Sequence, residues 1–140
     1  DIHSKISTDQ IFERVFDLYE YCNMVSKKLN KKIVFEISLG NEDGGFDRYE
    51  EIKHIVSKME NFCHGMDFPL PYFLVVRTGN YVMELKNVGS FESTFLDTNQ
   101  DSAKTNLLKI IEFCNKHQIR IKEHNTDYLS DRALQSRPIM

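Results

Sequence analysis

The sequence predicts an α/β protein made of about four consecutive β/α units of an eight-stranded β/α (TIM) barrel, in one domain over residues 1–140. The first observation is that strand-like segments alternate with amphipathic helical segments, which is typical of crossover units in a parallel sheet. The second is that the strand-like segments alternate apolar and polar residues. Central strands of an open doubly wound sheet are apolar on both faces, so this alternation favours a barrel.

The N-terminal part of the chain is predicted to form a short strand and a long helix. Residues 2–6 have the strand pattern, and Ser7 and Gln10 have the capping-box spacing that starts a helix ending near Leu29. Apolar residues recur in this helix every three or four positions, as expected for a helix packed on a core. This stripe consists of Phe12, Val15, Phe16, Tyr19, Cys22 and Val25.

A second strand and a second helix follow. Residues 33–39 form the strand, and the loop 40–45 is rich in residues that tolerate a positive φ. Asp47 is a candidate cap for a helix over residues 48–64. The residues expected to face inward on this helix are Tyr49, Ile52, Val56, Met59 and Cys63.

The C-terminal part is predicted to hold two more strands, over 72–77 and 119–124. Between them, residues 80–100 show no clear period, and long connections of this kind are often functional. A helix then begins near residue 101, and a short helix lies near 130–135. The residues expected to be buried on the longer of these helices are Leu107, Leu108, Ile111 and Cys114.

Composition and charge narrow the class of protein. The apolar fraction of 41% and the charged fraction of 28% are those of a soluble globular protein. A net charge of −3 gives no basic surface for nucleic acid, and no apolar run is long enough to span a membrane. With no signal peptide and three unpaired cysteines, we expect a cytoplasmic protein whose thiols are reduced and buried.

The two ends of the chain suggest a piece of a longer protein. The chain begins with Asp1 inside a predicted strand and stops at Met140 with no terminal element. Four strands cannot close a barrel alone, and an open half barrel leaves free strand edges and an uncovered inner face. The barrel prediction therefore also predicts further sequence that is missing here.

Polar residues gather near the carboxyl ends of the predicted strands. Lys5, Arg77 and Lys122 supply cations that suit a phosphate or carboxylate group, although each could instead extend to water from a strand end. Glu36 is a candidate base, metal ligand or ion-pair partner of a lysine. His3 and His124 with a carboxylate are candidate ligands for Zn²⁺ or another divalent metal, or hydrogen-bonded structural residues.

Several segments resemble a known family. The segment from Phe35 to Gly45, which includes Gly44 and Gly45, is similar to the strand and Gly-Gly loop of the accessory (Z-type) subunits of class II D-tagatose-1,6-bisphosphate aldolase. Val75-Val76-Arg77-Thr78-Gly79 resembles the end of a later strand in that family. Glu123-His124-Asn125-Thr126-Asp127-Tyr128 resembles its His-x-Thr-Asp-Tyr segment, and Ile2-His3 its first strand.

The resemblance implies a barrel fold and a place in sugar-phosphate metabolism. It implies that Glu36, His124 and Asp127 belong to the catalytic group, to which the strand pattern adds Lys5 as a further candidate. The residues expected to bind substrate are Arg77, Lys122, Gly44, Gly45, Gly79 and Tyr128. The chain has Lys5 where the family often has Asp, and Ser38-Leu39-Gly40 where it often has Gly-Thr-Glu, so it resembles a divergent member.

Three functions follow from these expectations. The chain could support or perform aldol cleavage of a ketose bisphosphate, through a metal or a lysine imine at Lys5 or Lys122. It could instead be a non-enzymatic assembly subunit that binds a catalytic aldolase subunit or a second copy of itself. A third interpretation is a free-standing α/β binding module.

Overall fold

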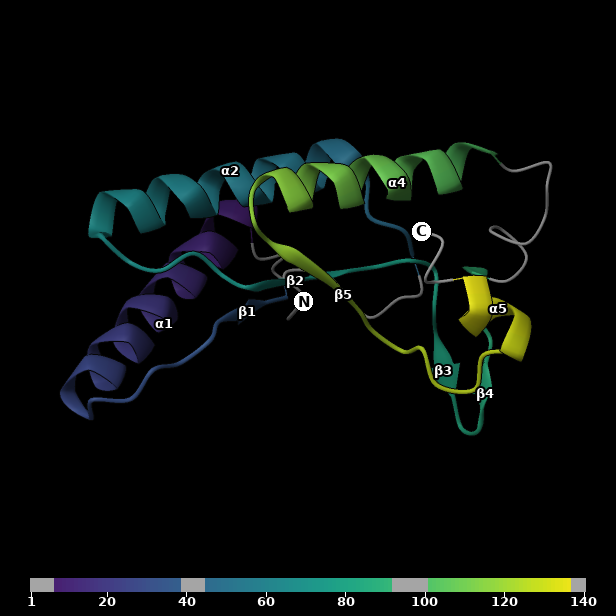
Figure 1. The fold of residues 1–140 in the computed structure, drawn as a ribbon, viewed down its shortest axis with the longest axis horizontal. Coiled ribbons are helices and arrows are strands. Elements are labelled where there is room, and N and C mark those ends of the chain that lie inside the picture. The colour runs from purple at the N-terminus through teal and green to yellow at the C-terminus, as the bar shows by residue number, and fades with distance from the viewer. Residues whose placement is uncertain (1–6, 39–44, 92–100, 137–140) are drawn as a thin grey trace, which may run out of the picture.

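The computed structural model describes residues 7–38, 45–91 and 101–136 (Figure 1). Helices alternate along these segments with the strands of a small parallel sheet, as the sequence predicts, and a separate two-stranded hairpin follows the second of these strands. The strand expected over 2–6 lies outside the described residues. The α/β prediction is confirmed, while the barrel stays a prediction.

Helix α1 (Thr8–Lys28) begins at the predicted capping box. The hydroxyl of Ser7 accepts a hydrogen bond from the backbone N–H of Gln10 at 3.2 Å, and the Gln10 side chain accepts one from the N–H of Ser7 at 3.0 Å. The helix ends where Asn30 adopts a left-handed φ of 51°. Phe12 and Tyr19 of the predicted stripe are buried, whereas Cys22 is exposed, so the expectation of a buried thiol there is wrong.

Helix α2 (Tyr49–Met66) buries the predicted inward residues Ile52, Val56, Met59 and Cys63. It ends at Asp67, whose left-handed conformation lets the N–H of Phe68 bond to the carbonyl of Cys63 at 2.9 Å. Its N-cap is Arg48 and not Asp47. The expected cap is wrong because the Asp47 carboxylate is bound by Arg77 instead.

Strands β1 (Glu36–Ile37), β2 (Phe73–Val76) and β5 (Arg120–Glu123) form a three-stranded parallel sheet with β2 in the middle. Each lies inside a predicted strand but is shorter. The register sets Ile37 beside Leu74, and Leu74 beside Ile121. Since paired residues of a sheet share a face, these three form one apolar surface.

All three long helices pack on this apolar face. The third, α4 (Asp101–Lys116), lies beside α2 above β2 and β5 (Figure 1). Tyr19 of α1 stacks on Phe35 with ring centroids 3.8 Å apart. The shared core contains Tyr19, Ile37, Ile52, Val56, Met59, Cys63, Leu74, Val76, Ile110, Cys114 and Ile119. Leu108 was expected to be buried but is 39% exposed, and Ile110 is buried instead.

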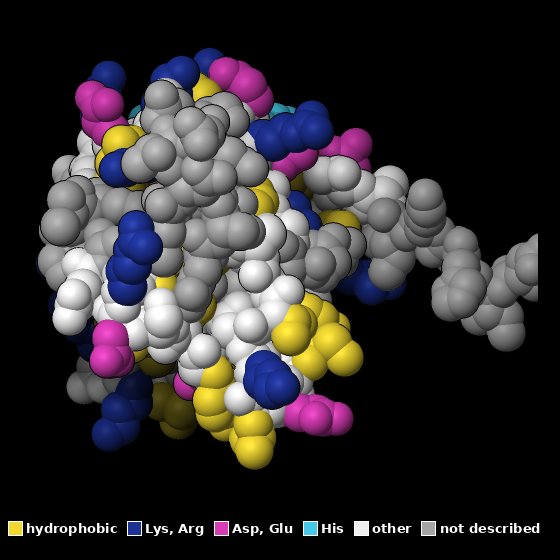
Figure 2. Space-filling view, turned by 90° about the vertical axis from the view of Figure 1, so that its right-hand side faces the viewer, with side chains coloured by type: hydrophobic (Ala, Val, Ile, Leu, Met, Phe, Trp, Pro, Cys, Tyr) yellow, Lys and Arg dark blue, Asp and Glu magenta, His cyan; other side chains and the backbone are white. Residues whose placement is uncertain are grey.

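The segment with no clear period holds a small hairpin that the sequence analysis missed. Strands β3 (Val82–Met83) and β4 (Lys86–Asn87) pair antiparallel, and the short helix α5 (Asp131–Ser136) lies near them (Figure 1). Figure 2 shows hydrophobic side chains along the lower edge of this side of the molecule. The exposed apolar residues of the hairpin and the turn after it are Met83, Leu85 and Val88.

Candidate functional site

The polar face of the sheet and the loops after its strands form the candidate site. Glu36, Phe73 and Arg120 are in register, as are Val75 and Lys122, so their side chains leave the sheet opposite the core. Glu36 and Lys122 are exposed. The predicted division of the strands into an apolar face and a polar face is therefore confirmed for β1 and β5.

Lys122 and Glu36 form an ion pair that passes over the central strand. The Lys122 Nζ lies 2.8 Å and 3.0 Å from the two carboxylate oxygens of Glu36, although the two residues are on opposite edge strands. Val75, the register partner of Lys122 on β2, is 7% exposed. The sequence analysis left Glu36 as a base, a metal ligand or an ion-pair partner, and the geometry shows the ion pair.

Arg77, directly after β2, is held by Asp47. The backbone N–H and the Nε of Arg77 each donate to a different carboxylate oxygen of Asp47, both at 2.7 Å. The N–H of Asp47 returns a bond to the carbonyl of Arg77 at 3.0 Å. Asn106 of α4 fixes this segment further, because its Nδ2 donates to the carbonyl of Asp47 and its Oδ1 accepts from the N–H of Tyr49.

Two glycines allow close packing at the end of β2. Gly79 has a φ of +83°, and a Cβ there would lie 2.3 Å from the ring of Phe46. Its N–H donates to the carbonyl of Gly45 at 3.0 Å. A Cβ on Gly89 would lie 2.0 Å from the carbonyl oxygen of Gly79. Gly79 and Gly45, expected to bind substrate, are thus brought together as backbone partners, while Gly44 lies outside the described residues.

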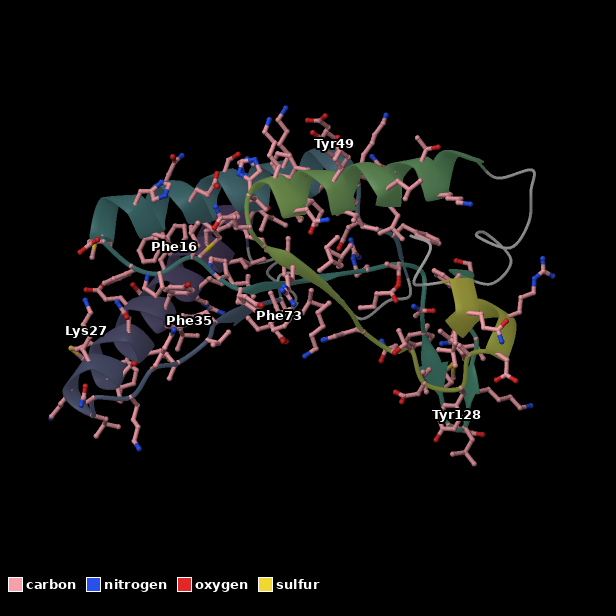
Figure 3. All side chains as sticks on the ribbon, viewed as in Figure 1. Phe16, Lys27, Phe35, Tyr49, Phe73 and Tyr128 are labelled. Atoms are coloured by element: carbon pink, nitrogen blue, oxygen red, sulfur yellow. The ribbon has the colours of Figure 1, made fainter. Side chains whose placement is uncertain are left out.

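The loop after β5 carries three predicted site residues. Asn125 and Tyr128 adopt left-handed backbone conformations, with φ of 56° and 59°. Asp127 and Tyr128 are exposed, and His124 is half-buried. Figure 3 shows Tyr128 at the hairpin end of the molecule, far from Phe16 and Phe35 beside α1. His124 follows directly on the polar strand β5, whereas Tyr128 projects from the far end of the loop.

Asn87 on the hairpin joins this loop to the rest of the fold. Its Nδ2 donates to the carbonyls of Asn125 at 2.8 Å and Asp127 at 3.3 Å. Its Oδ1 accepts from the N–H groups of Gly89 at 3.1 Å and Tyr81 at 3.4 Å. Asn87 and the role of Asp47 could not be predicted from the sequence, because the partners Asn125, Asp127 and Arg77 lie at least 30 residues away.

A pocket of about 570 Å³ opens beside Arg77. Its walls come from the first turn of α1, the first half of α2 and the end of β2. Four carboxylates line it, and Arg77 is the cation among the lining residues. The lining residues are Thr8, Asp9, Asp47, Glu50, Glu51, His54, Ile55, Leu74, Val75 and Arg77. Such a wall suits hydroxyl groups, which donate hydrogen bonds to carboxylates, better than it suits a phosphate.

The expected metal centre finds no support in the side chains that the structure describes. Among them, no group of three or more His, Cys, Asp or Glu residues is placed to hold a metal ion. His3, one of the two expected histidine ligands, and Lys5 lie outside the described residues. Glu36, the candidate carboxylate ligand, forms an ion pair with Lys122.

Two of the three thiols are buried in the core. Burial raises the pKa of Cys114 to about 11, and burial also raises the pKa of Cys63. The same effect raises the pKa of Tyr19, whose hydroxyl donates to the carbonyl of Pro69 at 2.7 Å. At neutral pH the two buried thiols are protonated and therefore weak nucleophiles. Their burial agrees with the sequence prediction.

The chain matches no family model, no curated protein and no solved structure in comparisons with known proteins. The resemblance to the aldolase accessory subunits therefore rests on the short sequence segments alone. In the described segments, moreover, no helix is long and apolar enough to cross a membrane.

Proposed function

We propose that this chain is part of a β/α barrel that binds a sugar phosphate and acts as an accessory subunit of a ketose-bisphosphate aldolase. The observation that carries the proposal is the one-sided sheet. Three parallel strands in sequential order have all three long helices on one face and charged residues on the other. In a barrel the helices form the outer ring, and the loops at the carboxyl ends of the strands hold the site.

The barrel is favoured over an open doubly wound sheet by this arrangement. In a doubly wound sheet the chain reverses direction across the sheet, so that helices cover both faces. Here the crossovers run from β1 to β2 to β5 in one direction, and α2 and α4 lie side by side on the same face. Further strands, from a longer chain or a second copy, would pair with the outer edges and enclose the polar face.

The polar groups support sugar phosphate as the ligand class. Lys122 and Arg77 bring positive charge to the polar face and to the carboxyl end of β2. The carboxylates beside Arg77 supply hydrogen-bond acceptors for sugar hydroxyls. A phosphate at Arg77 or Lys122 would share that cation with a carboxylate already bound to it, so we expect modest affinity for the phosphate alone.

The ion pairs favour a binding role over catalysis by lysine. Imine formation requires the lysine nitrogen to reach the substrate carbonyl, and the Nζ of Lys122 is instead bound to both carboxylate oxygens of Glu36. The second candidate function, direct aldol cleavage, would require this ion pair to open, so that Glu36 serves as the base or Lys122 as the nucleophile. An aldolase assay distinguishes the two.

The test uses D-tagatose 1,6-bisphosphate as substrate and follows release of triose phosphate. We expect no release by the protein alone, with or without added Zn²⁺, and increased activity when it is mixed with the catalytic subunit of tagatose-bisphosphate aldolase. His124→Ala and Asp127→Ala should retain this activation. If the protein alone releases triose phosphate, and Lys122→Gln abolishes this release, the chain is a catalyst and not an accessory subunit. Lys104→Gln, on the exposed surface of α4, is the control and should leave the release unchanged. No release, no activation and no binding of the sugar bisphosphate would contradict both.

A further inference from the structure

The loop 124–128 has no regular secondary structure to hold its shape. Two of its five residues have a positive φ, and neither is glycine. Left-handed conformations of non-glycine residues are unfavourable in isolation and persist where surrounding contacts impose them. The side chains of Asp127 and Tyr128 are exposed, so little packing from them fixes the loop.

Asn87 supplies such contacts from outside the loop. Its amide group donates to one carbonyl near the start of the loop, that of Asn125, and to one near its end, that of Asp127. The two carbonyls belong to residues on either side of Thr126. Holding both fixes the course of the backbone between the two left-handed residues.

The side-chain oxygen of Asn87 bonds to the residues on either side of the hairpin. Its Oδ1 accepts from Tyr81 and Gly89, which flank the hairpin on both sides. The N–H of Val88 bonds to the carbonyl of Tyr81 at 2.7 Å. Gly89 lies against the backbone of residues 79–81 so closely that a Cβ would overlap it. The hairpin therefore packs against the segment that follows β2. Through Asn87 it also bonds to the loop that follows β5.

We propose that Asn87 is a positioning residue of the candidate site. It holds loop 124–128, and with it His124, Asp127 and Tyr128, in the one conformation that a sugar phosphate meets. The ligand part of this inference rests on the proposed function, whereas the positioning part concerns the loop itself. In this role the hairpin, not only the strand ends, sets the geometry of the site.

Two substitutions separate positioning from simple stabilisation of the hairpin. Asn87→Asp keeps an acceptor for the N–H groups of Tyr81 and Gly89, but it replaces the donor with an oxygen that the carbonyls of Asn125 and Asp127 repel. Asn87→Ala removes both sides of the bridge. Asn115→Asp, on the exposed surface of α4, makes the same chemical change away from the site and is the matched control.

The experiment measures backbone order parameters by NMR relaxation and affinity for D-tagatose 1,6-bisphosphate by titration. In both Asn87 variants we expect order parameters in loop 124–128 to fall from about 0.85 to below about 0.6, with the helices unchanged. Affinity should fall by about tenfold, while Asn115→Asp matches the wild type. For Asn87→Asp, the hairpin amides of Tyr81 and Gly89 should stay ordered.

The two failures are distinguishable. If Asn87→Asp leaves the loop as ordered as in the wild type, or if only Asn87→Ala loosens it together with the hairpin, the positioning role is wrong. If the wild type does not bind the sugar bisphosphate, the proposed ligand is wrong, and the order parameters still decide whether Asn87 positions the loop. Loop disorder with unchanged affinity would overturn the link between the loop and the ligand.

Discussion

The helix-covered face of the sheet and the loops at its carboxyl end are held together by different forces. On the covered face, apolar residues such as Ile52, Val76 and Ile110 are at most 1% exposed. At the loop end, Asp47 and Asn87 each make several hydrogen bonds, and each bonds to backbone groups at least 30 residues away in the sequence. Packing is not directional and scales with the area removed from water, whereas these hydrogen bonds depend on individual atoms.

The difference shows where stability and function reside. The covered face can exchange apolar side chains of similar volume with little change of structure. The loop end cannot exchange Asn87 even for the isosteric aspartate without losing donors. A ligand site needs fixed polar groups, and this end of the sheet is where the fold fixes them.

The largest expected effect comes from opening a cavity in the covered face. Ile52→Ala should lower the free energy of unfolding by about 4 kcal/mol, because Ile52 is 1% exposed and its neighbours can refill the space only in part. Urea unfolding followed by circular dichroism measures this loss. Leu108→Ala, at a 39% exposed position on α4, should cost about 1 kcal/mol or less. Equal losses at the two positions would mean that α2 and α4 do not pack as described.

The next effect tests the close packing of the hairpin. Gly89→Ala should destabilise the protein by about 3 kcal/mol, because the new Cβ would lie 2.0 Å from a backbone oxygen that cannot move aside easily. Gly65→Ala is the matched control: it lies inside α2 with no atom within 4 Å of the added Cβ. Since alanine favours a helix more than glycine does, the control should stabilise by about 0.5–1 kcal/mol. A neutral result at Gly89 would show that the hairpin is not docked on residues 79–81.

A pH-dependent loss of stability should come from the covered face. The pKa of Cys114 is raised from 9.0 to about 11 in the folded protein. Below pH 9 the thiol is protonated in both states, and its contribution is complete. Between pH 9 and about 11 the unfolded state ionises first, so folding should lose roughly 2 kcal/mol through this group. Unfolding titrations from pH 8 to 10.5 should show a shallower loss in Cys114→Ala, and an unchanged slope would argue against burial of this thiol.

The smallest expected effect concerns the polar face. Glu36→Gln breaks the ion pair with Lys122, whose side chain is 46% exposed, against 37% for that of Glu36. Exposed pairs are worth between zero and about 1 kcal/mol, so the free energy of unfolding should change by less than about 1 kcal/mol. Chemical denaturation measures it. A loss above about 2 kcal/mol would mean that the polar face contributes to folding as much as the covered face does.

The covered face could be predicted from the sequence because its signals are local and repeated. The spacing of Ile52, Val56, Met59 and Cys63 predicts the inward side of α2, and the Ser7 and Gln10 pair predicts the start of α1. Periodicity does not say how wide the buried stripe is, so Cys22 was expected to be buried and is exposed. The same limit explains why Ile110, and not Leu108, faces the core.

The loop end could be predicted only in outline. The polar face and the interaction of Glu36 with a lysine follow from strand alternation. The hairpin has two-residue strands joined by Glu84 and Leu85, without the glycine or asparagine that usually marks a tight turn. Asp47 has the sequence position of a helix cap, but its partner Arg77 is 30 residues away. Contacts over such distances leave no spacing pattern in a single sequence.

In the proposed function the ligand binds on the polar face, at the strand-end loops and in the pocket beside Arg77, and not on the outer surfaces of α2 and α4. The most direct measurement is an NMR titration of the protein with D-tagatose 1,6-bisphosphate, which maps shifted amides onto the fold. We expect shifts at Arg77, Lys122 and loop 124–128, with the outer surfaces of α2 and α4 unchanged. Shifts confined to those helices, or none at millimolar ligand, would contradict it.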